Sequence, residues 1–267
     1  MPSNFPPDWA CAWGSDKHSP YPFADLKLTA DLRMRFRWVP PGRFRMGSPE
    51  DEAGRLSDEG PAHWVELSSG LWLAETPCTQ AQWVAVSGKN PSRFNEDRAC
   101  PVEQVSWDDC QEFCQQFCQQ LNKRMSGLTV RLPTEAEWEY ACRAGMLSAF
   151  NDGSNCTEPR GKDPALAKLG WFTENSESKT HPVGQLAANA WGFRDMHGNI
   201  DEWCQDYYGE YISNEQHDPP GHVFGAGRVI RGGCWFDSAG YCRSAYRFWG
   251  QSSYRSNFLG FRLAAGL

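Results

Sequence analysis

The pattern of apolar and polar positions predicts short strands first. From Met34, apolar and basic residues alternate in MRFRWVPPGRFRMGS around a Pro-Pro-Gly turn. Alternation with a period of two is typical of a strand with one buried face, and a turn between two such runs indicates a β-hairpin. The segment WVELSSGLWLA, residues 64–74, predicts two further short strands.

Three helices are indicated by the residues at their ends. Thr79 opens TQAQWVAVSG, which Gly88 closes, and the other two helices begin after Ser106 and after Thr134. Each of these last two has an acidic residue three positions beyond its polar start, which is the spacing of a capping box. Gly145 stands where the third helix is expected to stop.

The second of these helices carries a stripe of cysteines. Cys110, Cys114 and Cys118 recur every four residues and therefore share one helix face. No histidine or second close cysteine pair accompanies them, so we interpret them as small buried thiols on an apolar face. The chain has 11 cysteines and no export signal, which favours free thiols, although one or two disulfides stay possible at this point.

The remaining segments predict an irregular chain. Residues 48–62 are acidic and rich in turn formers, which indicates an exposed loop, and long Gly- and Asn-rich stretches follow residue 146. We predict one α+β domain with little regular secondary structure over residues 34–267. Residues 1–33 are rich in Pro and Trp and are expected to be an N-terminal extension that packs on this body.

Composition and charge exclude several classes of function. The formal net charge of the 267 residues is −7, whereas nucleic-acid binding needs clusters of Lys and Arg, so no nucleic-acid partner is expected. No apolar run reaches the roughly 20 residues that span a bilayer. The first residues show neither a basic region nor an apolar core, so a cytoplasmic location is expected, while surface display by another route stays open.

No familiar catalytic motif is present. The six histidines lack the spacing of a zinc protease, and the chain has no GxSxG, no Walker loop and no GxGxxG after a strand. Polar groups are densest in NAWGFRDMHGNIDEWCQD, where Asp195 and Glu202 flank a tight loop. Two carboxylates and released main-chain carbonyls suit calcium, and a purely structural turn is the alternative.

The C-terminal stretch has an unusual composition. Between Arg231 and Arg262 there is no Lys, Glu or Met, and most positions hold Phe, Tyr, Ser, Asp, Asn or Gly. Aromatic anchors among small polar residues are typical of antibody binding loops. Arg recurs at positions 231, 243, 247, 255 and 262, and we predict that these side chains form a scaffold by pairing with buried carboxylates and stacking on aromatic rings.

Five ordered motifs resemble one known family. FRWVPPGRFRMGS, CPVEQVSWDDCQEFC, RLPTEAEWEYACRAG, WGFRDMHGNIDEW and RVIRGGCWF…LGFRLA follow the pattern of the formylglycine-generating enzyme domain over about residues 34–265. The resemblance implies a C-type-lectin-like fold of the α+β class. It also implies a calcium site in DMHGNIDE, made of the Asp195 and Glu202 side chains and the Gly198 and Ile200 carbonyls.

The same resemblance argues against copper. The enzymes of the family hold copper through two cysteines five residues apart, soon after the Gly-Gly, and use it with oxygen to oxidise a substrate cysteine. Cys242 falls on the second position, but Asp237 occupies the first. Copper(I) prefers two soft thiolates, so no copper and no oxidase activity are expected.

The C-terminus also resembles the variable proteins of diversity-generating retroelements, which carry hypervariable residues on this lectin-like fold. After mutation at its adenines, an Asn codon that ends in C can encode Phe, Tyr, Ser, Asp, Asn or Gly, but never Lys, Glu, Met, Gln or Trp. The segment from about 231 to 262 obeys this restriction at most of its positions; Gln251 is an exception, and Trp249 is interpreted as a residue of the constant frame.

We therefore expect a binding protein for an unknown protein or other macromolecular ligand, with a copper- and oxygen-dependent oxidase of altered metal site as the alternative. A catalytically inactive structural module is a third reading. The residues expected to form the binding surface are Phe236, Asp237, Ser238, Tyr241, Tyr246, Phe248, Trp249, Gly250, Gln251, Ser253, Tyr254, Ser256, Asn257 and Phe258.

Overall fold

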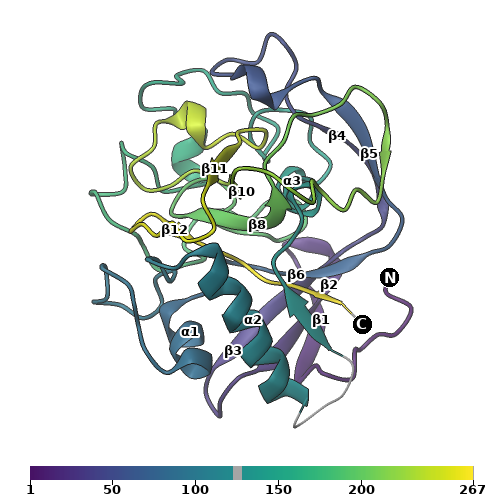
Figure 1. Cartoon of the computed structure of the whole chain (residues 1–267), viewed down its shortest axis with the longest axis vertical. Helices are drawn as coiled ribbons and strands as arrows, with labels where there is room; N and C mark the ends of the chain where they lie inside the picture. Colours follow the sequence, from purple (N-terminus) through teal and green to yellow (C-terminus); the bar gives the residue numbers. More distant parts are fainter. Residues whose placement is uncertain (123–127, 267) are drawn as a thin grey trace.

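A six-stranded sheet forms the lower part of the molecule in the computed structural model, which describes residues 1–122 and 128–266 (Figure 1). All neighbouring strands in this sheet are antiparallel. The N-terminal strands lie at one edge, and the last strand of the chain lies inside the sheet. In spatial order the sheet contains β1 (Ala12–Asp16), β2 (Ser19–Lys27), β3 (Arg33–Val39), β6 (Leu71–Ala74), β13 (Ala264–Gly266) and β7 (Thr129–Arg131).

Two helices lie side by side against this sheet, α1 (Gln80–Ser87) and α2 (Trp107–Asn122) (Figure 1). Thr79 caps α1 and Gly88 ends it in a left-handed conformation, as predicted. Before α2, the Ser106 hydroxyl and the Asp109 carboxylate accept each other's backbone amides. The cysteine stripe of α2 faces the largest apolar cluster, and all 11 cysteines are free thiols.

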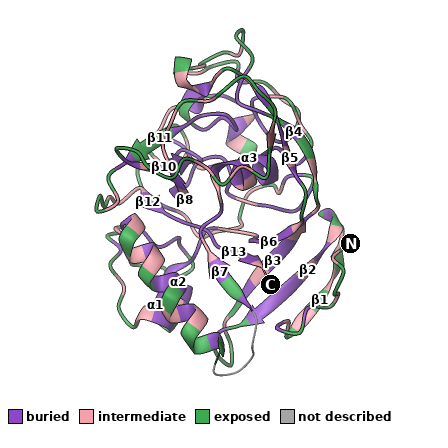
Figure 2. Ribbon diagram, turned by 45° about the vertical axis from the view of Figure 1, so that its right-hand side comes forward, coloured by how far each residue is buried: buried purple, intermediate pink, exposed green. Residues whose placement is uncertain are grey.

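The third helix, α3 (Glu135–Arg143), is almost entirely buried in the centre of the molecule (Figure 2). Thr134 and Glu137 form the predicted capping box at its start. The helix ends at Arg143, followed by left-handed Ala144 and Gly145. Its burial is unusual for so polar a segment and depends on ion pairs described below.

Two smaller sheets form the upper part of the molecule. One contains, in spatial order, β11 (Phe248–Gly250), β10 (Arg228–Arg231), β8 (Asp201–Tyr207) and β12 (Leu259–Gly260). The other contains β4 (Gly42–Met46), β5 (His63–Leu67) and β9 (Gln216–His217).

The predicted hairpin over residues 34–46 is wrong. Both runs are strands, but β3 pairs with β2 and β6, whereas β4 pairs with β5 in another sheet. The chain changes sheets between them, at the Pro-Pro pair. Strands β5 and β6 likewise belong to different sheets, so alternation located these four strands without revealing their partners.

The structure also refines the predictions for the N-terminal extension and for the acidic loop. Residues 1–33, expected as an extension, supply β1 and β2 to the main sheet and bury Trp9 in the largest apolar cluster. The acidic loop 48–62 is not wholly exposed, because Glu59 is fully buried against Arg243. Throughout residues 1–122 and 128–266, no helix combines the length and apolar character needed to cross a bilayer.

Candidate ligand-binding surface

The residues predicted to vary begin after a buried turn at Gly232 and Gly233 and end at Phe258, directly before strand β12. Gly232 and Gly233 have positive φ values of 108° and 71°, and a Cβ on Gly233 would lie 2.7 Å from the Cys242 sulfur. A larger residue at Gly233 would therefore push Cys242 away from this turn. Beyond it, the Trp235 indole N–H donates to the Asn257 carbonyl at 3.1 Å, and the Asp201 amide donates to the Phe258 carbonyl. The first bond joins the two ends of the segment to each other, and the second attaches its C-terminal end to strand β8.

Large aromatic side chains project from this segment into solvent. The most exposed ring is Phe236, at 46% of its accessible area, and four further aromatic residues are exposed to a similar extent. They are Tyr241, Phe248, Trp249 and Tyr254. The polar residues between them are also accessible: Gln251 and Ser253 are exposed, and Asp237, Ser238, Ser256 and Asn257 are half-buried.

Three of the aromatic residues form a continuous row. The ring centroids of Phe236 and Phe258 lie 4.9 Å apart, and those of Phe258 and Tyr254 lie 6.3 Å apart. Phe258 is half-buried and packs on the main apolar cluster, so it connects the exposed rings to the core. The contact between Phe236 and Phe258 is edge-to-face and that between Tyr254 and Phe258 is tilted, and such ring contacts hold the side chains in defined positions.

Tyr246 and Gly250 do not belong to the exposed surface, contrary to the prediction. Tyr246 is 9% exposed, because its ring packs against Tyr241 with the centroids 5.1 Å apart. Gly250 is buried beside Trp203, where an added Cβ would lie 3.0 Å from the indole ring. The residues on either side of it, Trp249 and Gln251, are both exposed.

The predicted arginine scaffold is confirmed at four of its five positions. Four of the arginines are buried and each meets buried carboxylates: Arg231 pairs with Glu139, Arg243 with Glu52 and Glu59, Arg247 with Glu135, and Arg262 with Glu202. The Arg247 guanidinium also lies 3.8 Å from the ring centroid of Tyr211. Arg255 is different, since it is exposed and pairs with Asp109 at 2.7 Å.

Beneath the exposed residues lies a group that sequence reasoning missed. Candidate ligand atoms of Asp201, Cys234 and Asp237 lie within 4.8 Å of one another. Asp237 accepts the Cys234 amide at 3.0 Å and the Cys234 thiol at 3.2 Å, whereas Oδ1 of buried Asp201 has no hydrogen-bond partner within the described chain. Burial and the nearby Asp237 charge raise the pKa of Asp201, and burial raises the pKa of Asp237. Sequence reasoning missed Asp201 because it lies 36 positions before Asp237, and no local pattern links the two residues.

Copper does not fit the residues at the family's copper positions. Cys242 is fully buried with Phe150, Cys156 and Ala239 in a separate apolar cluster, and burial raises the pKa of its thiol. Asp237 offers a carboxylate that already accepts two hydrogen bonds. A thiol and a carboxyl replace the two thiolates that copper(I) prefers.

Calcium does not fit the expected four residues either. Arg262 donates to both Glu202 oxygens at 2.7 Å, and the Trp138 indole N–H donates to one of them at 2.9 Å. The Gly198 carbonyl accepts the Ile200 amide, and Oδ2 of Asp195 accepts the Gly184 amide, whereas its buried Oδ1 has no hydrogen-bond partner within the described chain. Burial raises the pKa of Asp195 to about 6. The Arg262 guanidinium therefore already engages both oxygens of Glu202, which calcium would need as a free carboxylate ligand.

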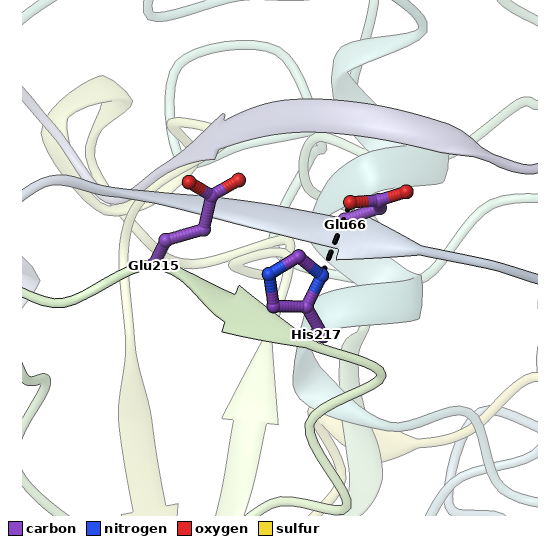
Figure 3. A group of neighbouring side chains, drawn as sticks. All are labelled: Glu66, Glu215 and His217. Carbon is purple, nitrogen blue, oxygen red and sulfur yellow. Dashed lines mark ion pairs between the residues drawn. The ribbon is translucent and has the colours of Figure 1, made fainter.

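A second group of metal-type ligands lies on the three-stranded sheet (Figure 3). His217 Nδ1 lies 3.1 Å from a Glu66 oxygen, and Glu215 stands beside them. All three side chains are accessible, and Glu215 pairs with Arg43 at 2.8 Å. This group is a surface ion-pair network.

Comparisons with known proteins identify the family to which this fold belongs. Residues 24–267 match the sulfatase-modifying factor enzyme 1-like domain, and the chain belongs to that family. This result confirms the predicted resemblance and fold class.

Three known proteins are similar to this chain over most of its length. The structure of Treponema denticola variable protein 1 superposes with a TM-score of 0.79 at 28% identity, covering 91% of this chain and 98% of that protein. A formylglycine-generating enzyme of Streptomyces coelicolor is 34% identical and is matched over 80% of this chain and 70% of its own length. The serine/threonine-protein kinase pkn1 of Chlamydia caviae is 29% identical over 85% of this chain, which spans 37% of the kinase.

Proposed function

We propose that this chain is a ligand-binding protein that displays a diversified surface at residues 236–258, and that it is not an enzyme. One observation carries the proposal: most positions with retroelement-type residues are accessible, Tyr246 and Gly250 excepted, while most of the interleaved arginines are buried. Phe236, Phe248 and Tyr254 are exposed, whereas Arg243 and Arg247 are buried in ion pairs.

Physical chemistry supports a binding role for such a surface. Exposed aromatic side chains give contact area at low entropy cost, and they are the residues that most often anchor interfaces. The ends of the segment are held by hydrogen bonds from Trp235 and Asp201, so binding requires little ordering of the backbone. A soluble monomer rarely exposes so many large apolar groups without a partner.

The similarity to Treponema denticola variable protein 1 supports the same proposal. We infer that a retroelement diversifies the codons of the exposed residues while the frame stays constant. The ligand is then a protein or other macromolecule whose identity differs between variants. Phe236, Tyr254 and Phe258 supply the anchors, and Asp237 and Asn257 supply polar selectivity.

The test is to sequence the DNA that flanks the gene. We expect a near-copy of the 3′ end that differs only at adenines, next to a gene for a reverse transcriptase. The differences should fall on the accessible residues of 236–258 and spare the codons of Arg243, Arg247 and Arg262. The absence of both the near-copy and the reverse transcriptase would overturn the proposal.

The second candidate is an oxidase with an altered metal site, favoured by the retained Cys242 and by the 34% identity to a formylglycine-generating enzyme. The deciding assay is copper(I) titration together with oxygen uptake on a cysteine peptide. Stoichiometric binding that Cys242→Ser abolishes, accompanied by oxygen uptake, would establish the oxidase. We expect neither.

A further inference from the structure

A cavity of about 160 Å³ opens between α3, β8 and the loops that precede and follow β9. Its polar groups include Asp206 near the end of β8, Glu210 in the following loop and Glu135 at the start of α3. Apolar walls are formed by Ile212, with Pro219 and Pro220. The proposed function does not use this cavity.

The charged side chains that line the cavity are all acidic. Three of the residues that line it are carboxylic acids, and none of the described residues that line it is Lys or Arg. The two imidazoles at its wall are already engaged: His63 Nδ1 lies 3.0 Å from the Pro61 carbonyl, and His222 Nε2 lies 3.1 Å from the Glu210 carbonyl.

Two of the acidic residues, Glu135 and Asp206, differ in whether an arginine side chain already pairs with them. Both oxygens of Glu135 are held by Arg247, at 2.6 and 2.9 Å. Asp206 is 5% exposed and accepts the Glu135 amide at 2.8 Å, but it forms no ion pair with any described residue. A buried carboxyl without a counter-ion is costly unless it is protonated or a cation binds beside it.

We propose that this cavity binds a small organic ammonium ion, whose charged nitrogen lies against Asp206 and whose short alkyl part packs on Ile212 and the two prolines. The volume suits such a ligand, because a cavity of roughly 150 Å³ holds a molecule the size of benzene. An inorganic cation would leave the apolar walls unused, and an anion would meet three carboxyl groups and no Lys or Arg side chain among the described residues that line the cavity.

This site makes ligand binding release a proton. Burial and the Glu135 charge raise the pKa of Asp206 to about 8, so at pH 7 the free carboxyl is mostly protonated. An ammonium ion favours the charged form and expels that proton. The titratable and charged groups around Asp206 are Glu135, Glu137, Arg131, Arg228, Cys204, His63, Glu210, Tyr211 and His222.

The experiment is isothermal titration calorimetry with n-butylammonium chloride, and with 1-butanol as the uncharged probe of similar shape. Measurements at pH 7 in buffers of different ionisation enthalpy give the number of protons released. We expect saturable binding of n-butylammonium with release of about one proton, falling toward zero well above pH 8. This measurement of proton release needs only the wild-type protein, so it does not depend on whether a variant folds.

Asp206→Asn is the matched variant, because an amide oxygen still accepts the Glu135 amide. We expect at least about tenfold weaker binding of n-butylammonium, with 1-butanol unaffected, whereas the exposed control Asp31→Asn should behave as wild type. Absence of ammonium binding to the wild type, equal binding of 1-butanol, binding without proton release, or an unchanged affinity in Asp206→Asn would each overturn the proposal.

Discussion

Arg262 donates from two nitrogen atoms to the two oxygens of Glu202, both at 2.7 Å, and both side chains are fully buried. The pair joins the end of the displayed segment to strand β8. It also means that Glu202, which the family resemblance placed in a calcium site, already has a protein cation as its partner.

Breaking this pair should destabilise the protein strongly. Arg262→Gln leaves the Glu202 carboxylate buried without its counter-ion, and such a loss costs about 3–5 kcal/mol. The control is Arg255→Gln, whose exposed pair with Asp109 contributes about 0–1 kcal/mol. Urea denaturation of both variants measures the difference, and similar losses in the two would contradict a scaffold made of buried pairs.

Calcium should leave the stability unchanged. Because Arg262 occupies the carboxylate of Glu202, we expect no shift in Tm when calcium is added or when EDTA is present. Differential scanning calorimetry at several calcium concentrations checks this. A saturable rise in Tm that Asp195→Asn removes would show that the ion binds after all.

The exposed aromatic residues should contribute little to folding. Phe248 is 42% exposed on β11, and Phe248→Ala should change the free energy of unfolding by no more than about 1 kcal/mol. Phe261 is fully buried between Trp83 and Phe113, and Phe261→Ala should cost about 3–5 kcal/mol. If Phe248→Ala were as destabilising as Phe261→Ala, the displayed surface would be part of the core.

The pair of Asp201 and Asp237 should make stability fall as pH rises. Both pKa values are raised in the folded state, so the folded protein binds more protons than the unfolded chain above about pH 4. Stability is then lost as pH rises from there through the raised pKa values. Asp237→Asn keeps an acceptor for the Cys234 amide and removes one charge, so it should raise Tm at pH 8 and have little effect at pH 4.

Thermal unfolding of the wild type and Asp237→Asn across this pH range tests the coupling. The half-buried, paired carboxylate of Asp109, which Arg255 neutralises, provides the comparison: Asp109→Asn should lower Tm at pH 8. A pH-independent effect of Asp237→Asn would mean that the two carboxyls do not interact.

Local sequence determined the parts of this protein that depend on neighbouring residues. Capping residues such as Thr134, with Glu137 three positions on, satisfy backbone amides within one turn, so the helix starts were predictable. Residue types alone also indicated the accessible segment around Phe236, because a segment that belongs to the core is expected to carry more Leu, Ile and Val than this one does.

Tertiary structure decided what depends on residues far apart in the chain. The strands before and after the Pro-Pro pair were predictable, but only the packing of the whole chain assigns β3 and β4 to different sheets. The calcium hypothesis weighed Glu202 with its near neighbours, whereas its actual partner, Arg262, is 60 positions away. Long-range pairing of this kind is set by how buried charges find counter-ions in three dimensions, and a linear pattern does not carry that information.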